Sequence, residues 1–531
     1  MDETNGDFFT PFWGTKFSFS KRSRNNIMIQ KTKLSRWFGS LLNERTEAKP
    51  KRSTRASRER KMLFESLERR EVFSTDLLSA FAYGNDTGGT LAKSVAVDVA
   101  GNSYMSGAFS GTVDFDPSMT HVGDTDILTA RGSQDAYVAK YAPDNSLIWA
   151  HRMGGDDQVV STLPPTFNDI GNKVKVDTTG NVFVVGSFKG AADFGSITLI
   201  TNGELDGYLV KFDSNGVVQW AKQWGGQVDE LGNGLALDGS NNVYVQGIGS
   251  SSNLAERGID ILKLNTAGTQ VWSKKVNSNG LYSDLAVDAA GNVFSIGTFS
   301  GTVDFDPSPK TNWVFSGNSS VATGYVLKLN SQGNFSWVSP FQSQGLSYAI
   351  SNSVAIDGTG NVIVGGSYYG AVDFNPGIGV TTLPNKGAFI TKLNSNGSLV
   401  WAKPLEQQDS NGGTTVVTAI AIGPAGSINV AGSFSGTTDF DPGVATDIRT
   451  SAGGQDAYIL NLNSSGGFGW METFGGTQND QATGIAVDAA GTIYVAGYFN
   501  GTVDFDPSLG TTNLSTSGSG RYSFLARFRR S

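Results

Sequence analysis

The sequence predicts an all-β fold, a seven-bladed β-propeller of four-stranded antiparallel blades. Three observations predict it: a composition rich in glycine, with 68 Gly and only 17% charged residues; a turn motif that recurs along the chain; and a last repeat that lacks one strand. Val, Ile, Phe, Tyr, Ser, Thr and Asn favour short strands and tight turns. There is no cysteine, which excludes disulfides and thiolate metal sites.

The repeat is marked by an apolar–Asp–x–x–Gly–Asn turn between two strands, as in SVAVDVAGNSYMSGAF at 94–109 and DLAVDAAGNVFSIGTF at 284–299. Six copies carry the aspartate and one carries glycine, which gives seven repeats with starts near 94, 173, 234, 284, 353, 418 and 484. The positions are Asp98, Asp177, Asp238, Asp288, Asp357, Gly423 and Asp488.

Alternation of apolar residues and turn chemistry place four strands, a to d, in each repeat. Strand c is DAYVAKY at 135–141 and DGYLVKF at 206–212, and strand d carries a tryptophan. The tryptophans are Trp149, Trp220, Trp272, Trp337, Trp401 and Trp470. One such sheet cannot bury both of its faces, so neighbouring blades are expected to pack radially.

The ends of the chain predict how the ring closes. The seventh repeat runs through its strand c at 522–527 and has no strand d after it. LLSAFAYGN at 77–85 aligns without a gap with strand d of the first repeat, LIWAHRMGG at 147–155. We therefore expect the N-terminal strand to complete the last blade, so that no long edge stays free.

Charge separates a leader, residues 1–76, from the propeller, residues 77–531. Residues 1–70 hold 17 basic and 8 acidic residues, a net charge of +9, whereas the remainder holds 23 and 40, a net of −17. The acidic body argues against nucleic acid as a partner. The leader is expected to be mostly disordered. A start at Met28 is an alternative beginning of the chain.

No apolar run approaches the roughly 18 residues of a membrane span, so no transmembrane segment is expected. The leader also lacks the apolar core of a conventional secretion signal.

Three features resemble the SBBP-type β-propeller repeats of bacterial surface and secreted proteins, over residues 77–531. They are the turn segment VAVDVAGN at 95–102 with its copy LAVDAAGN at 285–292, the DAYVAK-like strand, and the tryptophan strand ending in Gly–Gly. Departures are Ser79 at a tryptophan position and Gly423 at an aspartate position. KMLFESLERREVFS at 61–74 resembles the planctomycete extracellular motif. Both resemblances imply an extracellular or cell-surface location.

A second signature lies between strands b and c: GTVDFDP at 111–117, 301–307 and 501–507, and GTTDFDP at 436–442. Alternate residues of an extended segment face the same way, and paired carboxylates suit calcium. The candidate calcium ligands are Asp114, Asp116, Asp304, Asp306, Asp439, Asp441, Asp504 and Asp506. The alternative is structural, with aspartate accepting backbone N–H groups and phenylalanine plugging the blade.

The turn aspartate also accompanies a basic residue on strand c, and in the copy with Gly423 the strand c position is Asn461. Because a buried carboxylate needs a partner, we predict structural ion pairs, across strand b or between blades. The pairs are Asp98 with Lys140, Asp177 with Lys211, Asp238 with Lys263, Asp288 with Lys328, Asp357 with Lys392, and Asp488 with Arg527.

These features predict a non-catalytic, monomeric propeller that binds a protein or a glycan, with no cofactor unless calcium is one. The chain has only two histidines, His121 and His151, and its Asp pairs are repeated, whereas a catalytic pair normally occurs once. Two alternatives stay open: a glycan-degrading enzyme on the propeller, and a calcium-dependent adhesion or lectin-like module. Function is expected where the repetition fails.

Overall fold

A computed structural model describes residues 75–85, 88–116, 126–156, 169–226, 229–249, 258–278, 280, 282–316, 321–409, 412–508, 510–518 and 520–530. The chain divides into two units, Met1–Arg70 and Glu71–Ser531, and all described residues belong to the second. Predictions about residues 1–74, the 61–74 motif among them, and about His121 lie outside the described residues.

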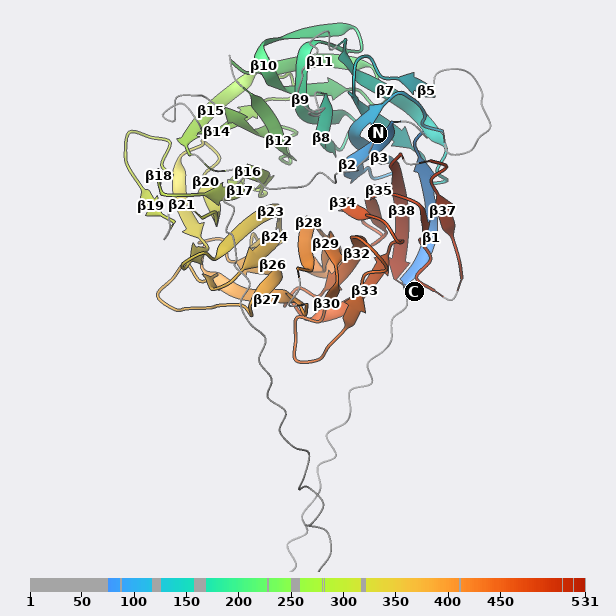
Figure 1. The fold of residues 1–531 in the computed structure, drawn as a ribbon. Coiled ribbons are helices and arrows are strands. Elements are labelled where there is room, and N and C mark those ends of the chain that lie inside the picture. Colours follow the sequence, from blue (N-terminus) through green and yellow to red (C-terminus); the bar gives the residue numbers. More distant parts are fainter. Residues whose placement is uncertain are drawn as a thin grey trace, which may run out of the picture. The chain divides into compact units, whose positions relative to one another are not determined.

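The all-β class is confirmed. The one helical element of the described residues is η1, a 3-10 turn at Pro424–Gly426. The pairing of the described strands gives seven groups of four antiparallel strands, here called blades one to seven in chain order of their first strands. Pairing of β7 (Leu147–Gly155) with β9 (Val182–Phe194) joins the first two groups into one eight-stranded sheet, and two short strands extend the fifth to six. The first strands contact one another in sequence, and that of blade seven contacts that of blade one, so they line a closed ring (Figure 1).

Strand a, the innermost, is β2 (Gly89–Val97), β8 (Ile170–Val176), β12 (Glu230–Leu237), β16 (Tyr282–Val287), β23 (Tyr348–Ile356), β28 (Thr414–Ile422) and β34 (Gln481–Val487). Strand b is β3 (Ser103–Ser110), β9 (Val182–Phe194), β13 (Val243–Gly249), β17 (Val293–Phe299), β24 (Val362–Tyr369), β29 (Ile428–Ser435) and β35 (Ile493–Phe499). Each of the seven strands a begins two to five residues before the predicted repeat start.

Strand c is β6 (Asp135–Tyr141), β10 (Ile197–Phe212), β14 (Gly258–Leu264), β20 (Thr323–Leu329), β26 (Lys386–Leu393), β32 (Asp456–Leu462) and β38 (Tyr522–Arg530). Strand d is β7 (Leu147–Gly155), β11 (Val218–Trp224), β15 (Gln270–Asn277), β21 (Phe335–Pro340), β27 (Leu399–Gln407), β33 (Phe468–Phe474) and, in blade seven, β1 (Thr75–Tyr83).

The N-terminal strand completes blade seven, as predicted. β1 pairs antiparallel with β38 from Thr75 opposite Arg530 to Tyr83 opposite Ser523. Phe81 and Tyr83 are buried between blades seven and one. The strand begins at Thr75 rather than at the predicted residue 77, because Thr75 and Asp76 continue the ladder.

Short strands extend the b–c connections, and one of them, β22 (Gln342–Ser343), belongs to the d–a connection between blades four and five. They are β4 (Thr112–Asp114) with β5 (Ile127–Thr129), β18 (Thr302–Asp304) with β19 (Trp313–Phe315), β30 (Thr437–Asp439) with β31 (Ile448–Thr450), β36 (Thr502–Asp504) with β37 (Asn513–Ser515), and β22 (Gln342–Ser343) with β25 (Val372–Asp373). Strand direction places the b–c and d–a connections on one face of the ring, the loop face, and the a–b and c–d turns on the other, the turn face.

Candidate functional site

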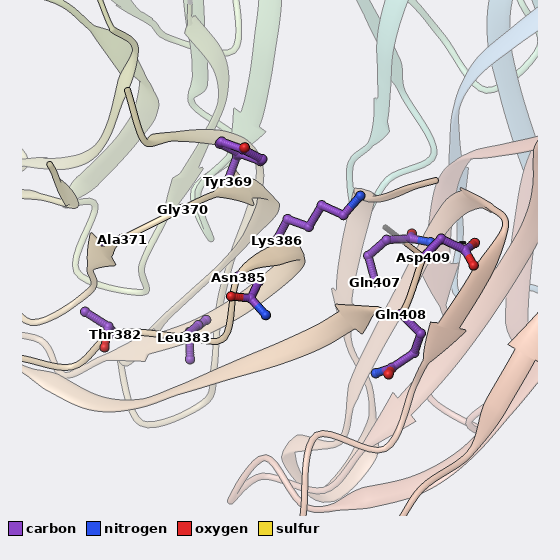
Figure 2. Close-up of a pocket in the computed structure, with 10 residues that line it drawn as sticks. All are labelled: Tyr369, Gly370, Ala371, Thr382, Leu383, Asn385, Lys386, Gln407, Gln408 and Asp409. Carbon is purple, nitrogen blue, oxygen red and sulfur yellow. Dashed lines mark hydrogen bonds between the residues drawn. The ribbon is translucent and has the colours of Figure 1, made fainter. Parts of the chain in front are cut away.

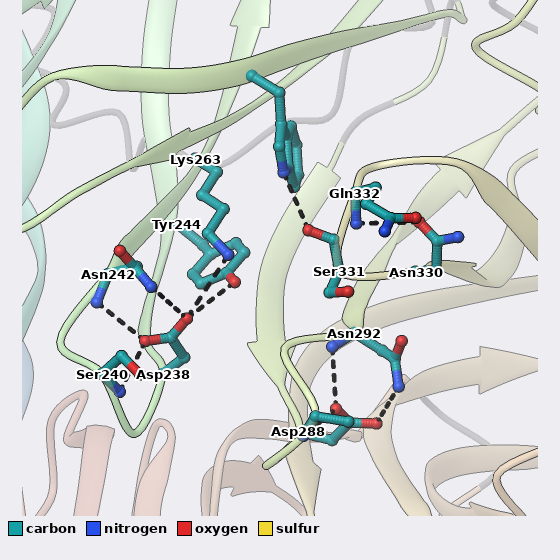
Figure 3. A network of polar contacts seen from close by, with 12 residues as sticks. Asp238, Ser240, Asn242, Tyr244, Lys263, Asp288, Asn292, Asn330, Ser331 and Gln332 are labelled. Carbon is teal, nitrogen blue, oxygen red and sulfur yellow. Dashed lines mark hydrogen bonds and ion pairs between the residues drawn. The ribbon is translucent and has the colours of Figure 1, made fainter.

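The repeated aspartate organises the a–b turn on the turn face. Asp238 accepts the backbone N–H groups of Ser240 and Asn242, the Asn242 side-chain amide and the Tyr244 hydroxyl (Figure 3). Burial acts to raise the pKa of Asp238, but these hydrogen bonds prevail and lower it. The aspartate is thus the centre of a structural turn.

The basic residue of strand c reaches into the following blade. Lys140 and the indole of Trp149 both donate to the carbonyl oxygen of Ser214, in the c–d turn of blade two. Lys211, Lys328 and Lys392 donate to the carbonyl oxygens of Thr266, Ser395 and Ser464. Arg527 of blade seven donates to the carbonyl oxygens of Ala142 and Pro143 of blade one, so the closing seam repeats the pattern.

Two of the predicted ion pairs are formed within 4 Å. Lys263 Nζ lies 3.7 Å from Asp238 Oδ2 across strand b (Figure 3), and Lys392 Nζ lies 2.8 Å from Asp357 Oδ2. In the other four copies the basic side chain donates to the next blade instead; these residues are Lys140, Lys211, Lys328 and Arg527. The aspartate of each of these copies accepts backbone N–H groups of its own a–b turn; these are Asp98, Asp177, Asp288 and Asp488. The basic side chain therefore joins blades in most copies.

The Asp-Phe-Asp-Pro segments are built as turns. Asp304 accepts the N–H groups of Asp306 and Asn312, and Asp306 accepts that of Ser308. Asp439 and Asp504 likewise bind the N–H groups of Asp441 and Asp506, and Asp114 binds that of Asp116. The described residues contain no group of three or more His, Cys, Asp or Glu that could hold a metal. Calcium binding stays a prediction.

The phenylalanine of this segment fills the blade interior. Phe305 is fully buried and meets Phe299 of strand b at 5.2 Å and Tyr325 of strand c at 4.9 Å between ring centroids. The same three-ring cluster recurs around Phe115, Phe194, Phe374, Phe440 and Phe505. Aromatic packing of this kind accounts for the repetition of the motif without a ligand.

Pairs of buried acids lie at three seams on the loop face. Asp135 and Asp456 are the first residues of their strands c, and Asp206 lies at the equivalent position within the longer β10. The acid just before or at the start of the next strand a is Asp169, Asp480 or Glu230. The Gly–Gly that ends each intervening strand d leaves the space: a Cβ on Gly154 would lie 2.7 Å from the Asp135 carboxyl carbon and 2.6 Å from Asp169 Oδ2.

The three seams differ in what compensates the charge. The strand d residue that pairs with the tyrosine of strand c differs among the three blades. It is Arg152 in blade one, Gln223 in blade two and Thr473 in blade six. Arg152 forms an ion pair with Asp135 at 2.6 Å, and Gln223 donates a long hydrogen bond to Asp206 at 3.4 Å. Asp206 Oδ1 and Asp456 Oδ1 are buried and have no hydrogen-bond partner.

In two of these pairs one acid has a pKa raised to about 6 or about 7. Burial raises the pKa of Glu230 to about 7, and the charges of Asp206, Asp229 and Asp260 add to the effect against a hydrogen bond from Gly226. Burial likewise raises the pKa of Asp480 to about 6, with a further contribution from Asp456. Like charges in one buried site disfavour ionisation of both carboxyl groups, so the charges of Asp206 and Asp456 act on the pKa values of Glu230 and Asp480 in the same direction as burial.

These pairs were not predicted from the sequence, where Gly–Gly was interpreted only as the end of strand d. A signal was present: Gly154–Gly155, Gly225–Gly226 and Gly475–Gly476 occur in the copies whose strand c begins with aspartate. The seam between blades five and six has no Gly–Gly. There the neutral side chain of Gln407 accepts a hydrogen bond from the Thr415 hydroxyl and donates to the carbonyl oxygens of Ser435 and Thr437.

A hollow lies on the loop face of blade five. Its volume is about 640 Å³. Figure 2 shows Lys386 extended between Tyr369 and the segment Gln407–Asp409. The rest of the lining is Gly370, Ala371, Thr382, Leu383 and Asn385. Asp409 is held by the backbone N–H of Thr437.

An exposed aromatic pair borders this hollow. Tyr348 and Tyr369 stack with ring centroids 5.8 Å apart, and they are 38% and 50% exposed. In other repeats the residue that follows the aromatic of strand b is small or polar, as in Ser110, Lys189, Ser300, Ser435 and Asn500. The tyrosine of blade five is therefore not required by the blade architecture.

His151 is half-buried on strand d at the seam between blades one and two. Its ring stacks on Phe212 at 5.6 Å with an interplanar angle of 9°, and burial lowers its pKa. No helix among the described residues has the length and apolar character to cross a membrane.

No protein-family model matches the chain. It is 24% identical over 229 residues to the uncharacterized WD repeat-containing protein L264 of Acanthamoeba polyphaga mimivirus, over 36% of this chain and 16% of that protein. It is 29% identical over 140 residues to the regulatory protein FlaEY of Caulobacter vibrioides, over 25% of this chain and 14% of that protein. The matched regions thus span about a sixth or less of these relatives.

Among solved structures, the chain is similar to the RRP9 WD40 repeats with a TM-score of 0.43 and 7% identity, covering 86% of this chain and 100% of that one. The Neurospora crassa Pan2 WD40 domain gives a TM-score of 0.39 and 9% identity, covering 85% and 97%. These scores are low, and the propeller fold is established here by the strand pairing itself.

Proposed function

We propose that this chain is a non-catalytic binding module of the extracellular space or cell surface, which contacts a protein or glycan through the loop face of blade five. The observation that carries the proposal is the stacked pair Tyr348–Tyr369 beside the 640 Å³ hollow. Large exposed aromatic rings that the fold does not need are typical of binding surfaces.

The lining favours a ligand rich in hydroxyl or amide groups. The side chains of Asn385 and Gln408 offer both donors and acceptors, and Lys386 offers a cation. An aromatic edge with a few polar groups suits a sugar ring or a polar peptide. The resemblance of residues 61–74 to an export motif supports the proposed location.

The acids of the described residues support a non-catalytic module. The buried pairs recur at three seams and lie between blades, whereas the described lining of the hollow of blade five contains one acid, Asp409, which accepts the backbone N–H of Thr437. General acid–base catalysis requires a proton donor or acceptor within reach of a bound substrate.

Replacing both tyrosines with serine, Tyr348→Ser/Tyr369→Ser, is expected to weaken ligand binding at least tenfold because the aromatic platform is lost. Binding is measured on a panel of defined glycans and peptides with the full chain. Trp313→Ser is the matched control, since Trp313 is 64% exposed on the hairpin of blade four. Ligands that bind both variants as tightly as the original chain would contradict the proposal, as would a panel without any ligand.

A further inference from the structure

In five seams, a tryptophan of strand d covers a glycine in the c–d turn of the following blade. A Cβ on each glycine would lie 2.9–3.2 Å from the indole ring, and each glycine has a positive φ between +76° and +84°. The pairs are Trp149 with Gly216, Trp220 with Gly268, Trp272 with Gly333, Trp337 with Gly397, and Trp401 with Gly466.

The indole also meets an aromatic ring and a carbonyl group. Trp149 lies 6.2 Å from Tyr104 of strand b, and Trp272 lies 6.1 Å from Tyr244. The indole N–H of Trp272 donates to the carbonyl oxygen of Ser331 in the following blade at 3.1 Å. Each such seam is therefore an aromatic slot filled by the protein's own tryptophan.

The seam between blades seven and one has the slot without the tryptophan. Ser79 lies opposite Arg527 in the β1–β38 ladder, just as Trp149 lies opposite Lys140 and Trp272 opposite Lys263. The covered glycine is replaced by Asn145, with a φ of 73°. Both halves of the tryptophan–glycine contact are thus absent from this seam.

A hollow of about 420 Å³ remains at this position on the turn face. Tyr494 lines it from strand b, at the position of Tyr104 and Tyr244, and the Arg527 guanidinium lies 5.3 Å from the Tyr494 ring centroid. Pro143, Asp144, Asp488 and Arg529 form other parts of the lining. The walls that hold an indole elsewhere are present here.

We propose that this slot binds an aromatic side chain, an indole or a phenol, presented by a partner polypeptide. An aromatic ring would contact Tyr494 and Arg527 through ring and cation–π contacts. The polar N–H or O–H of the ring would face the carboxylates of Asp144 and Asp488. An aliphatic side chain could fill the volume but could use neither interaction. The slot lies on the face opposite blade five's hollow and does not depend on the function proposed for it.

The test uses fluorine NMR of a short capped peptide with one 5-fluorotryptophan, titrated with the full chain. The double variant Ser79→Trp/Asn145→Gly restores the tryptophan–glycine contact of the other seams and should fill the slot. We expect the fluorine resonance to shift and broaden with the original chain, and the double variant to reduce the affinity at least tenfold. Ser79→Met, which can adapt to the space, should reduce it partly if the double variant folds poorly.

Three results would overturn the proposal. The first is the absence of any shift with the original chain. The second is equal binding by the original chain and both slot variants. The third is binding that increases when Trp13 and Trp37 are changed to alanine in the full chain, since an indole of the leader would then be the occupant. Trp313→Ser, remote from the slot, is the control and should bind like the original chain.

Discussion

A chain that begins at residue 84, and so lacks β1, is expected to lose the cooperative unfolding transition of the propeller or to aggregate. β1 supplies strand d of blade seven and buries Phe81 and Tyr83 between two blades. Loss of a buried aromatic side chain costs about 3–5 kcal/mol. Two such losses and a missing strand are comparable to the whole stability of a domain, about 5–15 kcal/mol.

The matched control is a chain that begins at residue 74, which keeps β1 intact. Both chains are compared by circular dichroism melting and size-exclusion chromatography. We expect the control to melt like the full chain. A chain without β1 that melts within a few degrees of the control would show that the strand is dispensable for the ring.

The thermal stability of the propeller is expected to fall as the pH rises from about 4.5 to about 7. The pKa of Glu230 is raised from 4.5 to about 7 and that of Asp480 from 3.8 to about 6. A raised folded-state pKa means that the folded chain retains a proton the unfolded chain releases. The stabilisation is therefore complete below the unfolded pKa and is lost through the folded one.

Each pair is expected to contribute at most about 3 kcal/mol over this range, since one pKa unit corresponds to about 1.4 kcal/mol. The turn aspartates act in the opposite direction at lower pH. Hydrogen bonds lower the pKa of Asp98, Asp177 and Asp238 although burial opposes this, so their contribution is lost as the pH falls below about 4. Maximum stability is expected near pH 4–5.

The double variant Asp206→Asn/Asp456→Asn should flatten the decline above pH 5. Each substitution removes a charge that raises the pKa of Glu230 or Asp480, so the remaining acid loses less stabilisation on ionising. Melting temperatures are measured from pH 4 to 8. Glu204→Gln is the control, because Glu204 is exposed in an ion pair with Lys189. A variant with the original slope would rule out the acid pairs as the cause.

The blade architecture and its closure could be predicted because each depends on local signals repeated along the chain. Asp98 and its counterparts fix a turn within five residues, and the alignment of 77–85 with 147–155 needs only a comparison of two short segments. The bounds of strand a were predicted late, since residues such as Gly89 and Tyr348 precede the turn motif by several positions.

Contacts between blades could be predicted only in part. Lys140 was expected to pair with Asp98, but its Nζ bonds the Ser214 carbonyl oxygen of the next blade, 74 residues away. A carbonyl acceptor leaves no trace in the sequence, because every residue has one. The acid pairs could not be predicted from the sequence, because each pair joins strand c of one blade to strand a of the next. The relative position of these strands is set by the fold.

The sequence predicted neither the hollow of blade five nor the empty slot at Ser79. It predicted only that function lies where the repetition fails. Ser79 was identified as a departure, but its consequence depended on Asn145 and Tyr494, which the fold brings to the same seam. Tyr369 belongs to none of the repeated sequence motifs, so the sequence did not indicate it as a candidate site residue. Its exposure follows from the end of β24 on the loop face.

The closure of the ring by β1 is tested most directly with a cysteine pair, because the chain has no cysteine of its own. Asp76 and Arg529 are exposed partners in the β1–β38 ladder, and paired Cα atoms of such a ladder lie about 4.5–5.5 Å apart, within disulfide range. We expect Asp76→Cys/Arg529→Cys to oxidise to one intramolecular disulfide that speeds migration on a non-reducing gel. Asp76→Cys/Arg521→Cys should stay reduced. Free thiols in both variants after oxidation would contradict the closure.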